Sequence, residues 1–450
     1  MSHYVAFIGL IVLTLLWRNL APASLRRVAV PWAFAILLMN VACSAFYWGP
    51  IRAAYVLMNY SAFVIMLDGF DAGSKRNNPA WSAFLLFYGY MVFSSVYGFY
   101  KFAAVFYWVN NFLTTFCCGY FAARWVARNE NGLSRLLFAM ACVSCVTALL
   151  YAKHGGLSTL EAESAGRAGL DVETLAEDVI SNVNYIALVM LTLIPFLVAG
   201  LLHTACTKRD KIAKRLSLVA LILCGLALVR TGARNGAVGL LPSLWYFLFS
   251  TTNRIKRRKR VAMFVVITMV FIPLVMFMMK GAESVRFLDF SGRQRQDDYR
   301  SAGDAITTGR ISMWQRNLED MTVVQLMIGR GMARWSLVED MDGRKAGRLT
   351  AGNAHSIYMT VIYNSGVLGL LLLFAFVVVS VKCGFRMGDR GRLALLFIGT
   401  WLFSGVAESW GMVGGAMAVL CGFGIGLLSH QVATNSEFNE KIDFVPVCWG

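Results

Sequence analysis

The hydrophobic positions of the chain fall into long blocks that are separated by short polar loops. A helix needs about 20 mostly apolar residues to cross a bilayer, and most of the blocks approach this length. Backbone groups find no water in the hydrocarbon core, so helices are the expected spanning element. The candidate spans are residues 2–17, 28–49, 53–67, 80–100, 102–123, 136–152, 183–206, 216–229, 235–250, 261–279, 356–381, 393–409 and 412–430. The pattern predicts an all-α polytopic membrane protein, a single integral domain over residues 1–450 with about 12–14 transmembrane helices.

The composition agrees with a membrane location and explains the charge. Of the 450 residues, 58% are hydrophobic and 15% are charged, whereas soluble domains carry about 25% charged residues. The net charge of +17 would point to nucleic acid in a soluble protein. Here most of the loop Lys and Arg residues fall in alternate loops, which the positive-inside rule assigns to the cytoplasm. The excess of positive charge therefore reflects membrane topology, and no nucleic-acid partner is expected. The same rule places the N-terminus outside if residues 2–17 span the membrane.

The sequence lacks the motifs of several kinds of functional site, including redox, metal and nucleotide sites. The ten cysteines avoid the external loops, and the CxxC of Cys142 and Cys145 lies within a span, where packing is the better interpretation. No His or Cys spacing indicates zinc, and no P-loop or GxSxG motif is present. No basic segment precedes the first span, so no cleaved signal peptide is expected. The sequence predicts a protein without a metal or a cofactor.

Two long segments fall on the predicted external side. Residues 154–182 are acidic, and residues 280–355 form the largest polar loop of the chain. Within this loop, residues 311–328 place apolar side chains three and four positions apart, which predicts an amphipathic helix on the membrane face or over the bundle. Loops of this length in compact proteins tend to carry function. A disordered connector remains an alternative, and it fits residues 291–308 better than the second half.

Two arginines break the rule that the external side avoids positive charge. Arg230 and Arg234 lie in RTGARNG, the predicted tight turn between the spans 216–229 and 235–250. A guanidinium group matches phosphate oxygens with two parallel hydrogen bonds. Arginines at a membrane boundary are a functional hypothesis by default, although arginines that reach toward the interface from helix ends give the same pattern.

Two further titratable residues lie near the external ends of predicted spans. His355 stands at the end of the long loop, where it could hold a proton or simply cap the next helix. Glu408 is a lone carboxylate in an apolar run, and an unpaired charge there is unfavourable. Glu408 therefore needs a cation as partner, and Arg230 and Arg234 are the candidates.

Taken in order, these motifs resemble the O-antigen ligase and polymerase superfamily over residues 182–408. The resemblance includes NVNYIALVMLTLIPFL, RTGARNGAVG, GRISMWQRNLEDM, IGRGMARW and AHSIYMTVIYNSGVLGLL. The last stretch is similar to the histidine and Gly-x-x-Gly signature of the family, with Gly366 and Gly369 as its glycines. Ser356 follows the histidine where many members have Asn, and the first 180 residues show only a generic helical likeness.

The resemblance implies a fold similar to that of C-type glycosyltransferases and an enzyme of the bacterial inner membrane whose active face is periplasmic. It implies metal-independent, inverting transfer of a glycan from undecaprenyl pyrophosphate to an acceptor sugar hydroxyl. Arg230 and Arg234 would bind the pyrophosphate and act in catalysis, and His355 would orient or deprotonate the acceptor hydroxyl. Arg310 and Arg330 are secondary candidates for phosphate or sugar contacts, and Glu408 would hold an arginine in place.

Three functions remain to be separated. A polymerase adds repeat units to another lipid-linked glycan, and a ligase transfers the glycan to lipid A-core or another acceptor; we favour the polymerase. Both belong to surface polysaccharide synthesis, as O-antigen, capsule or exopolysaccharide, and other assembly proteins are candidate partners. A structural membrane subunit is a further alternative, but it leaves RTGARNG and the long loop unexplained. A transporter for a polysaccharide or lipid is the third function, but it predicts internal repeats and polar residues near the midplane. The chain shows no convincing repeat, and its polar motifs gather at the external face.

Overall fold

The computed structural model describes residues 22–40, 47–48, 51–52, 61–62, 64–67, 78–97, 105, 108–109, 111–129, 131–154, 183–203, 206–231, 234–250, 255, 257–262, 269, 310–331, 356–406 and 416–428. These residues are almost entirely helical. The strands of the described part are two residues long and pair antiparallel, with Tyr47 opposite Arg52. The predicted all-α class is confirmed for this part of the chain.

The elements follow one another as α2 (Ala23–Asn40), β1 (Tyr47–Trp48), β2 (Ile51–Arg52), α4 (Pro79–Ser94), η1 (Ser95–Tyr97), η2 (Phe112–Cys117), α6 (Cys118–Arg128), α7 (Gly132–His154), α10 (Val183–Leu202), α11 (Lys208–Thr231), α12 (Arg234–Phe249), α15 (Arg310–Glu319), α16 (Val323–Ile328), α18 (Ile357–Arg386), α19 (Gly388–Ser404) and α20 (Ala416–Leu428). Here η1 is a 3₁₀ turn and η2 is a π-helical stretch.

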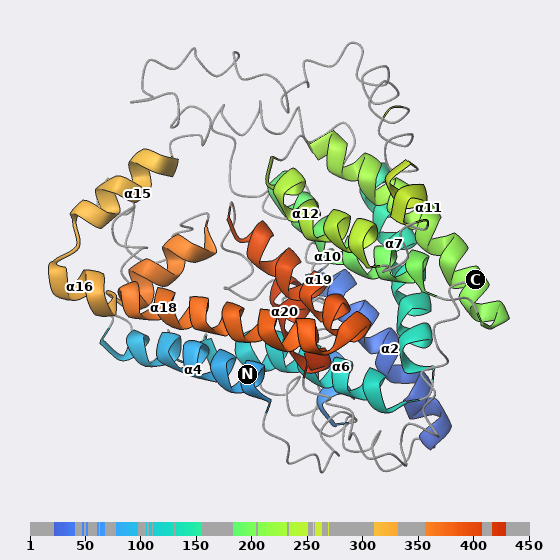
Figure 1. Cartoon of the computed structure of the whole chain (residues 1–450), viewed down its shortest axis with the longest axis horizontal. Coiled ribbons are helices and arrows are strands. Elements are labelled where there is room, and N and C mark those ends of the chain that lie inside the picture. The colour runs from blue at the N-terminus through green and yellow to red at the C-terminus, as the bar shows by residue number, and fades with distance from the viewer. Residues whose placement is uncertain are drawn as a thin grey trace.

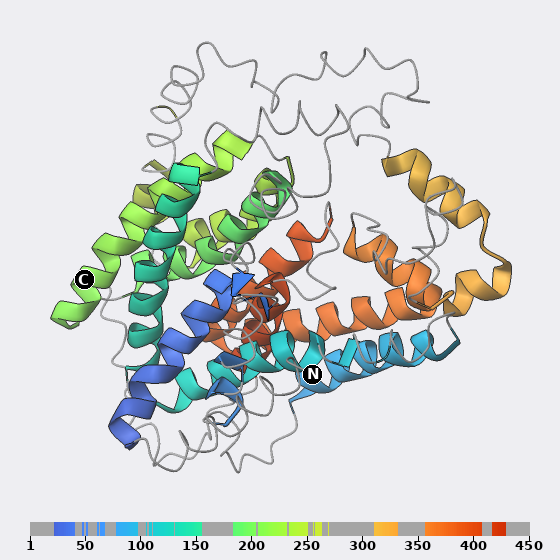
Figure 2. The same ribbon diagram turned by 180° about the vertical axis from the view of Figure 1, so that it is seen from behind.

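The helices form one body with a continuous apolar core (Figures 1 and 2). Helix α20 packs against α6 and α19, α11 packs against α7 and α10, α12 packs against α19, and α18 packs against α4 and α16. The buried rings of Phe34, Phe196, Phe397 and Phe423 meet where α2, α10, α19 and α20 come together. Helices α15 and α16 lie at one edge of this body, and α11 reaches the opposite edge (Figures 1 and 2).

Small residues let α6 and α20 approach until their backbones touch. A Cβ atom added at Gly119 would lie 2.1 Å from the carbonyl oxygen of Val419, and one added at Gly422 would lie 2.1 Å from that of Phe116. Helices in lipid associate through such close contacts because no hydrophobic effect drives them together. The packing of this pair is typical of a membrane protein.

The outer surface of the helices agrees with the predicted location in a bilayer. Leu86, Leu371 and Phe374 are each more than half exposed on α4 and α18, an unfavourable arrangement in water but a natural one against acyl chains. Two described helices, α7 through its segment Gly132–Leu149 and α18, are long and apolar enough to cross a membrane. Helices α2, α4, α10, α11, α12, α19 and α20 overlap further predicted spans, and the total number of spans stays a prediction. The predicted span 2–17 lies outside the described residues.

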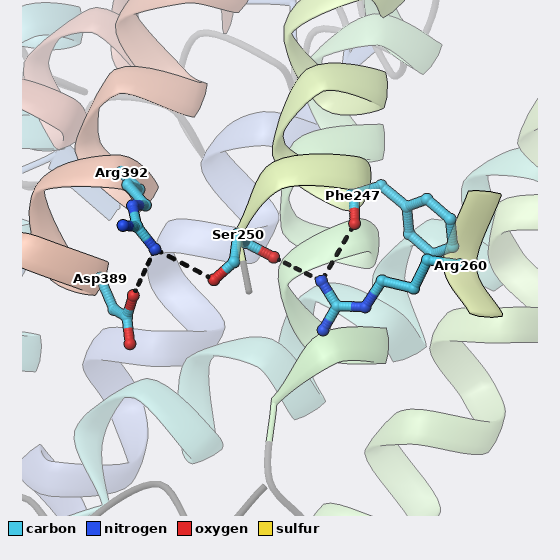
Figure 3. A network of polar contacts seen from close by, with 5 residues as sticks. All are labelled: Phe247, Ser250, Arg260, Asp389 and Arg392. Carbon is cyan, nitrogen blue, oxygen red and sulfur yellow. Dashed lines mark hydrogen bonds and ion pairs between the residues drawn. The ribbon is translucent and has the colours of Figure 1, made fainter. Parts of the chain in front are cut away.

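Side-chain hydrogen bonds join several helix ends that the positive-inside rule assigns to the cytoplasmic side. Arg260 donates to the carbonyl oxygen of Phe247 at 3.0 Å and to Ser250 Oγ at 2.7 Å, and Arg392 donates to Ser250 O at 3.3 Å and to Asp389 at 3.0 Å (Figure 3). The end of α12, the start of α19 and the helical residues 257–262 therefore meet. We call this region, together with the starts of α2, α7 and α11, the basic end of the molecule.

Hydrogen bonds also join different helices at the opposite end of the molecule, which the sequence predicts to be external. The backbone N–H of Ile357, at the start of α18, donates to the carbonyl oxygen of Gly405 after α19 at 2.7 Å. Tyr90 Oη, near the end of α4, donates to the carbonyl oxygen of Ile328 in α16 at 3.4 Å. We call the region of α15, α16 and the start of α18 the loop end. The assignment of these two ends to the cytoplasmic and the external side of a membrane stays a prediction from the sequence.

Candidate functional site

The arginine turn connects two helices, as the sequence predicts. Helix α11 ends at Thr231 and α12 begins at Arg234, so Arg230 occupies the last turn of one helix and Arg234 the first position of the next. Their side chains lie outside the described part of the structure. The backbone places the N-terminal end of α12 at this turn, and the free N–H groups and dipole of such an end favour anions.

Close packing holds the start of α12 in place. A Cβ atom at Gly236 would lie 2.5 Å from Cδ2 of Leu228 in α11, and one at Gly239 would lie 2.6 Å from Cδ1 of Leu191 in α10. Only residues without a side chain allow α12 to lie this close to both neighbours. The arginine turn is therefore carried by a helix whose position is fixed on two sides.

A break in α18 is the second feature of the site. Gly366 has φ +65° and ψ −166° inside this 30-residue helix, a backbone conformation that is essentially restricted to glycine. The break removes the helical partners of nearby carbonyl groups. The N–H of Arg330 donates to the carbonyl oxygen of Tyr363 at 2.7 Å, and the N–H of Gly331 donates to that of Asn364 at 3.1 Å. Backbone of the long loop thus satisfies the carbonyl groups that the break exposes.

The loop and the break fit together so closely that a side chain would separate them. A Cβ atom at Gly366 would lie 2.4 Å from the carbonyl carbon of Met327, and one at Gly329, which has φ +91°, would lie 2.2 Å from the carbonyl oxygen of Asn364. Both positions require glycine for their dihedral angles and for the close approach. The segment after α16 is consequently docked on α18 rather than merely near it.

The structure replaces the single predicted helix over residues 311–328 with two helices, α15 and α16. Thr322 accepts a hydrogen bond from the N–H of Gln325, and Gln325 Oε1 accepts one from the N–H of Thr322, which forms a capping box. This cap begins a new helix because it satisfies N–H groups at the start of α16. Tyr363 Oη donates to the carbonyl oxygen of Trp314 at 2.9 Å and so ties α15 to α18 as well.

Arg330 is the predicted site residue that this geometry positions best. Its Nε donates to Gln325 Oε1 at 3.0 Å, and its backbone is held by Tyr363. The side chain is half-buried at the broken helix. Arg310 is the first residue of α15 and is also half-buried. These two arginines belong to the segment at the edge of the molecule opposite α11 (Figure 1), and no described contact joins them to the arginine turn.

His355 and Glu408 lie outside the described residues. Their neighbours in the sequence are described: Ser356 is the N-cap residue of α18, and Val406 follows the end of α19. The hydrogen bond between Ile357 and Gly405 stands two residues from His355 and three from Glu408 along the chain. The ion pair between Glu408 and an arginine stays a prediction.

Two residues beside the broken helix, Gln325 and Asn364, are not among the site residues predicted from the sequence. Gln325 fixes the guanidinium group of Arg330, and the Thr-x-x-Gln pattern of a capping box could have drawn attention to it. Asn364 is buried, and its Oδ1 atom has no hydrogen-bond donor among the described residues. No pattern in a single sequence distinguishes such an amide from an ordinary core residue.

One match to a known family covers both the arginine turn and the broken helix. The described residues define an all-α protein in which one long apolar helix is broken and a segment of the long loop docks on the break. Residues 219–374 match the family model described as O-antigen ligase, and this match confirms the resemblance to the O-antigen ligase and polymerase superfamily for that stretch. It begins in α11 and ends in α18, so it contains Arg230, Arg234, Arg310, Arg330 and His355, whereas Glu408 lies beyond it. The chain matches none of the curated proteins with which it was compared.

The family match also supports a coarse function and location. Members of this family act in the synthesis of bacterial surface polysaccharides and lie in the inner membrane. The match supports an enzyme of that pathway with a lipid-linked glycan and an acceptor as its substrates.

Proposed function

We propose that the protein transfers a glycan from undecaprenyl pyrophosphate to an acceptor sugar hydroxyl at the periplasmic face of the membrane. The observation that carries this proposal is the extent of the family match. Residues 219–374 include the arginine turn, the docked loop and the broken helix, which are the features with chemistry suited to an anionic lipid-linked donor.

The arginine turn would bind the leaving group. The acceptor oxygen attacks the anomeric carbon with inversion, and the bond from that carbon to the phosphate oxygen breaks. Undecaprenyl pyrophosphate leaves with the electron pair and gains negative charge. Arg230, Arg234 and the N-terminal end of α12 would stabilise this charge, because fixed donors aimed at a developing charge lower the barrier to its formation. The proposed mechanism is metal-independent, as the resemblance implies.

The loop end would bind and orient the acceptor. His355, directly before the N-cap of α18, would orient the acceptor hydroxyl or take its proton. Arg330 and Arg310 would contact phosphate or sugar oxygens from the docked loop. Broken helices in membrane proteins commonly form binding sites because their backbone is irregular where it lines a cavity. The structure supports this role for Arg330 by fixing its backbone and its guanidinium group.

Within this reaction we favour a polymerase, whose acceptor is another lipid-linked glycan. The second candidate is a ligase that uses lipid A-core, and the family match is compatible with either activity. Both use the same donor, so Arg230 and Arg234 would serve either activity. The difference lies in the acceptor alone.

A strain that lacks the protein separates the two activities. We expect a gel of its surface polysaccharide to show lipid A-core capped with a single repeat unit, because ligation continues when polymerisation stops. Loss of all capped core would identify a ligase instead. Polysaccharide of normal length and amount would contradict both the polymerase and the ligase. A changed profile that the wild-type gene fails to restore would also contradict them. Accumulation of complete repeat units on the cytoplasmic leaflet would identify a transporter.

A further inference from the structure

A pocket lies at the basic end, away from the proposed glycan site. It has a volume of about 180 Å³, opens between α2, α7 and α11, and is lined by Val28, Pro31, Trp32, Arg135, Phe138 and Arg209. Trp32 and Phe138 meet edge to face, with their ring centroids 6.3 Å apart. The wall is therefore apolar and aromatic except for the two arginines.

The two arginines give this pocket a positive charge that no described residue neutralises. Among the described residues, no carboxylate lines the pocket and neither Arg135 nor Arg209 pairs with one. The Nε atom of Arg135 is buried and has no acceptor in that part of the chain. Buried donors without an acceptor are rare because they lose their hydrogen bonds to water. A ligand oxygen would supply the missing acceptor.

A hydrogen-bonded contact between α7 and α11 builds the pocket. Ser134 Oγ donates to Asp210 Oδ1 across the two helices. The N–H and Oγ1 of Thr207 both lie 2.8 Å from Asp210 Oδ2. Arg135 and Arg209 are the sequence neighbours of the two joined residues, so this contact fixes the backbone that carries both guanidinium groups. The carboxylate of Asp210 is occupied by these donors.

The pocket lies where the phosphates of the inner leaflet are expected. The charge rule assigns the starts of α2, α7 and α11 to the cytoplasmic surface, and the pocket joins all three. The helical rise places Arg209 about 32 Å along α11 from Arg230, roughly the thickness of a bilayer core. Val28 and Trp32 are exposed on α2 at 49% and 36%, so acyl chains could continue from the pocket along this helix.

We propose that this pocket binds the phosphate of an anionic phospholipid from the cytoplasmic leaflet. Arg135 and Arg209 donate hydrogen bonds to the phosphodiester oxygens, since guanidinium groups match phosphate geometry. Trp32 and Phe138 contact the glycerol and the first acyl carbons. The chemistry recognised is a phosphate oxygen next to an apolar chain, which distinguishes a lipid headgroup from free phosphate. This site does not depend on the proposed glycan transfer.

Native mass spectrometry of the full-length protein in detergent tests the proposal. Dioleoylphosphatidylglycerol should bind saturably to one tight site, and Arg135→Gln or Arg209→Gln should weaken that site about tenfold, because each removes a charge-assisted hydrogen bond. Arg215→Gln is the matched control: Arg215 is exposed on the same helix α11 but does not line the pocket. This control should bind lipid as the wild type does.

Further probes separate a lipid headgroup from other ligands. Inorganic phosphate and glycerol phosphate should bind far more weakly than the lipid, since they lack the apolar chain. Binding of inorganic phosphate as tight as that of the lipid would replace the lipid with a soluble anion and overturn the proposal. Equal lipid binding by the wild type and both pocket variants would also overturn it. Circular dichroism checks that the variants fold, and Arg209→Gln changes an exposed side chain, so it should remain folded.

Discussion

At the basic end of the molecule, arginine and aspartate side chains close the ends of helices, whereas at the loop end a glycine breaks a helix and a loop fills the break. Asp210 joins α7 to α11, and Arg260 and Arg392 meet at Ser250 (Figure 3). At the loop end, the carbonyl groups freed at Gly366 are satisfied by backbone from a segment that is distant in the sequence. The first arrangement completes regular helices, and the second maintains an irregular one.

This difference indicates where the fold serves stability and where it serves function. Capping and joining contacts lower the free energy of the folded bundle at modest cost. A glycine-only conformation inside a long helix loses hydrogen bonds and persists only where its surroundings hold it. Such strain is found preferentially at binding and catalytic sites. Of the two ends, the loop end is therefore the one whose disturbance should affect activity more.

Among changes at these two ends, the largest effect should follow Gly366→Ala. The new Cβ atom would meet Met327 and would force a dihedral angle that alanine avoids, which should destabilise the docked loop by about 3 kcal/mol. We expect about a hundredfold loss of glycan transfer in membrane vesicles. Gly388→Ala is the control, since Gly388 also has positive φ, at +60°, but open space around it. It should reduce stability slightly and leave transfer intact; equal losses in both variants would show that the docked loop has no special role.

Replacement of Asp210 with alanine should affect stability instead of transfer. It removes the hydrogen bonds from Ser134 and Thr207, and the free energy of unfolding should fall by about 2 kcal/mol. Thermal unfolding in detergent measures this loss. Transfer by the folded fraction should be unchanged, so a variant of wild-type stability that had lost transfer would contradict the division between the two ends.

The same contact has a predictable pH dependence. Burial opposes ionisation of Asp210, but hydrogen bonds from Ser134 and Thr207 and the nearby His203 outweigh it and lower the pKa below its ordinary value of 3.8. A lowered pKa in the folded state means that the contribution is complete above pH 3.8 and is lost as the pH falls through the folded value. The difference in melting temperature between the wild type and Asp210→Ala should therefore shrink only under strongly acidic conditions. A difference that vanished near neutral pH would refute this assignment.

Gln325→Leu should have a smaller effect, confined to the loop end. It removes the acceptor that holds Arg330 Nε and one half of the capping box. We expect about a tenfold decrease in transfer, corresponding to the loss of one hydrogen bond to a charged group. Thr322→Ala disturbs the same cap but leaves the acceptor for Arg330, so it should retain transfer. Gln325→Glu keeps an acceptor and should rescue activity; if Gln325→Leu and Thr322→Ala behave alike, Gln325 acts on helix stability alone.

The sequence predicts the regular parts of this molecule better than its irregular parts. The apolar runs predict α11 and α12 on either side of the arginine turn, although α11 begins eight residues before the predicted span because its basic first turns are helical too. Gly366 and Gly369 are recognisable as a motif, but nothing in the sequence shows that Arg330 and Gly331 complete the broken helix. That contact joins residues more than thirty positions apart. The pocket of Arg135 and Arg209 escaped notice for the same reason, since it depends on how three separate helices pack.

The central claim is that external arginines stabilise a departing lipid pyrophosphate. The most direct measurement is the rate of glycan transfer from a radiolabelled undecaprenyl-pyrophosphate donor in vesicles that contain Arg230→Ala, Arg234→Lys or the control Arg257→Gln at equal amounts. Arg257 is exposed in the helical residues 257–262 at the basic end. The account predicts that both external variants lose transfer while they remain in the membrane, and that the control keeps it. Wild-type rates in Arg230→Ala and Arg234→Lys would contradict the account.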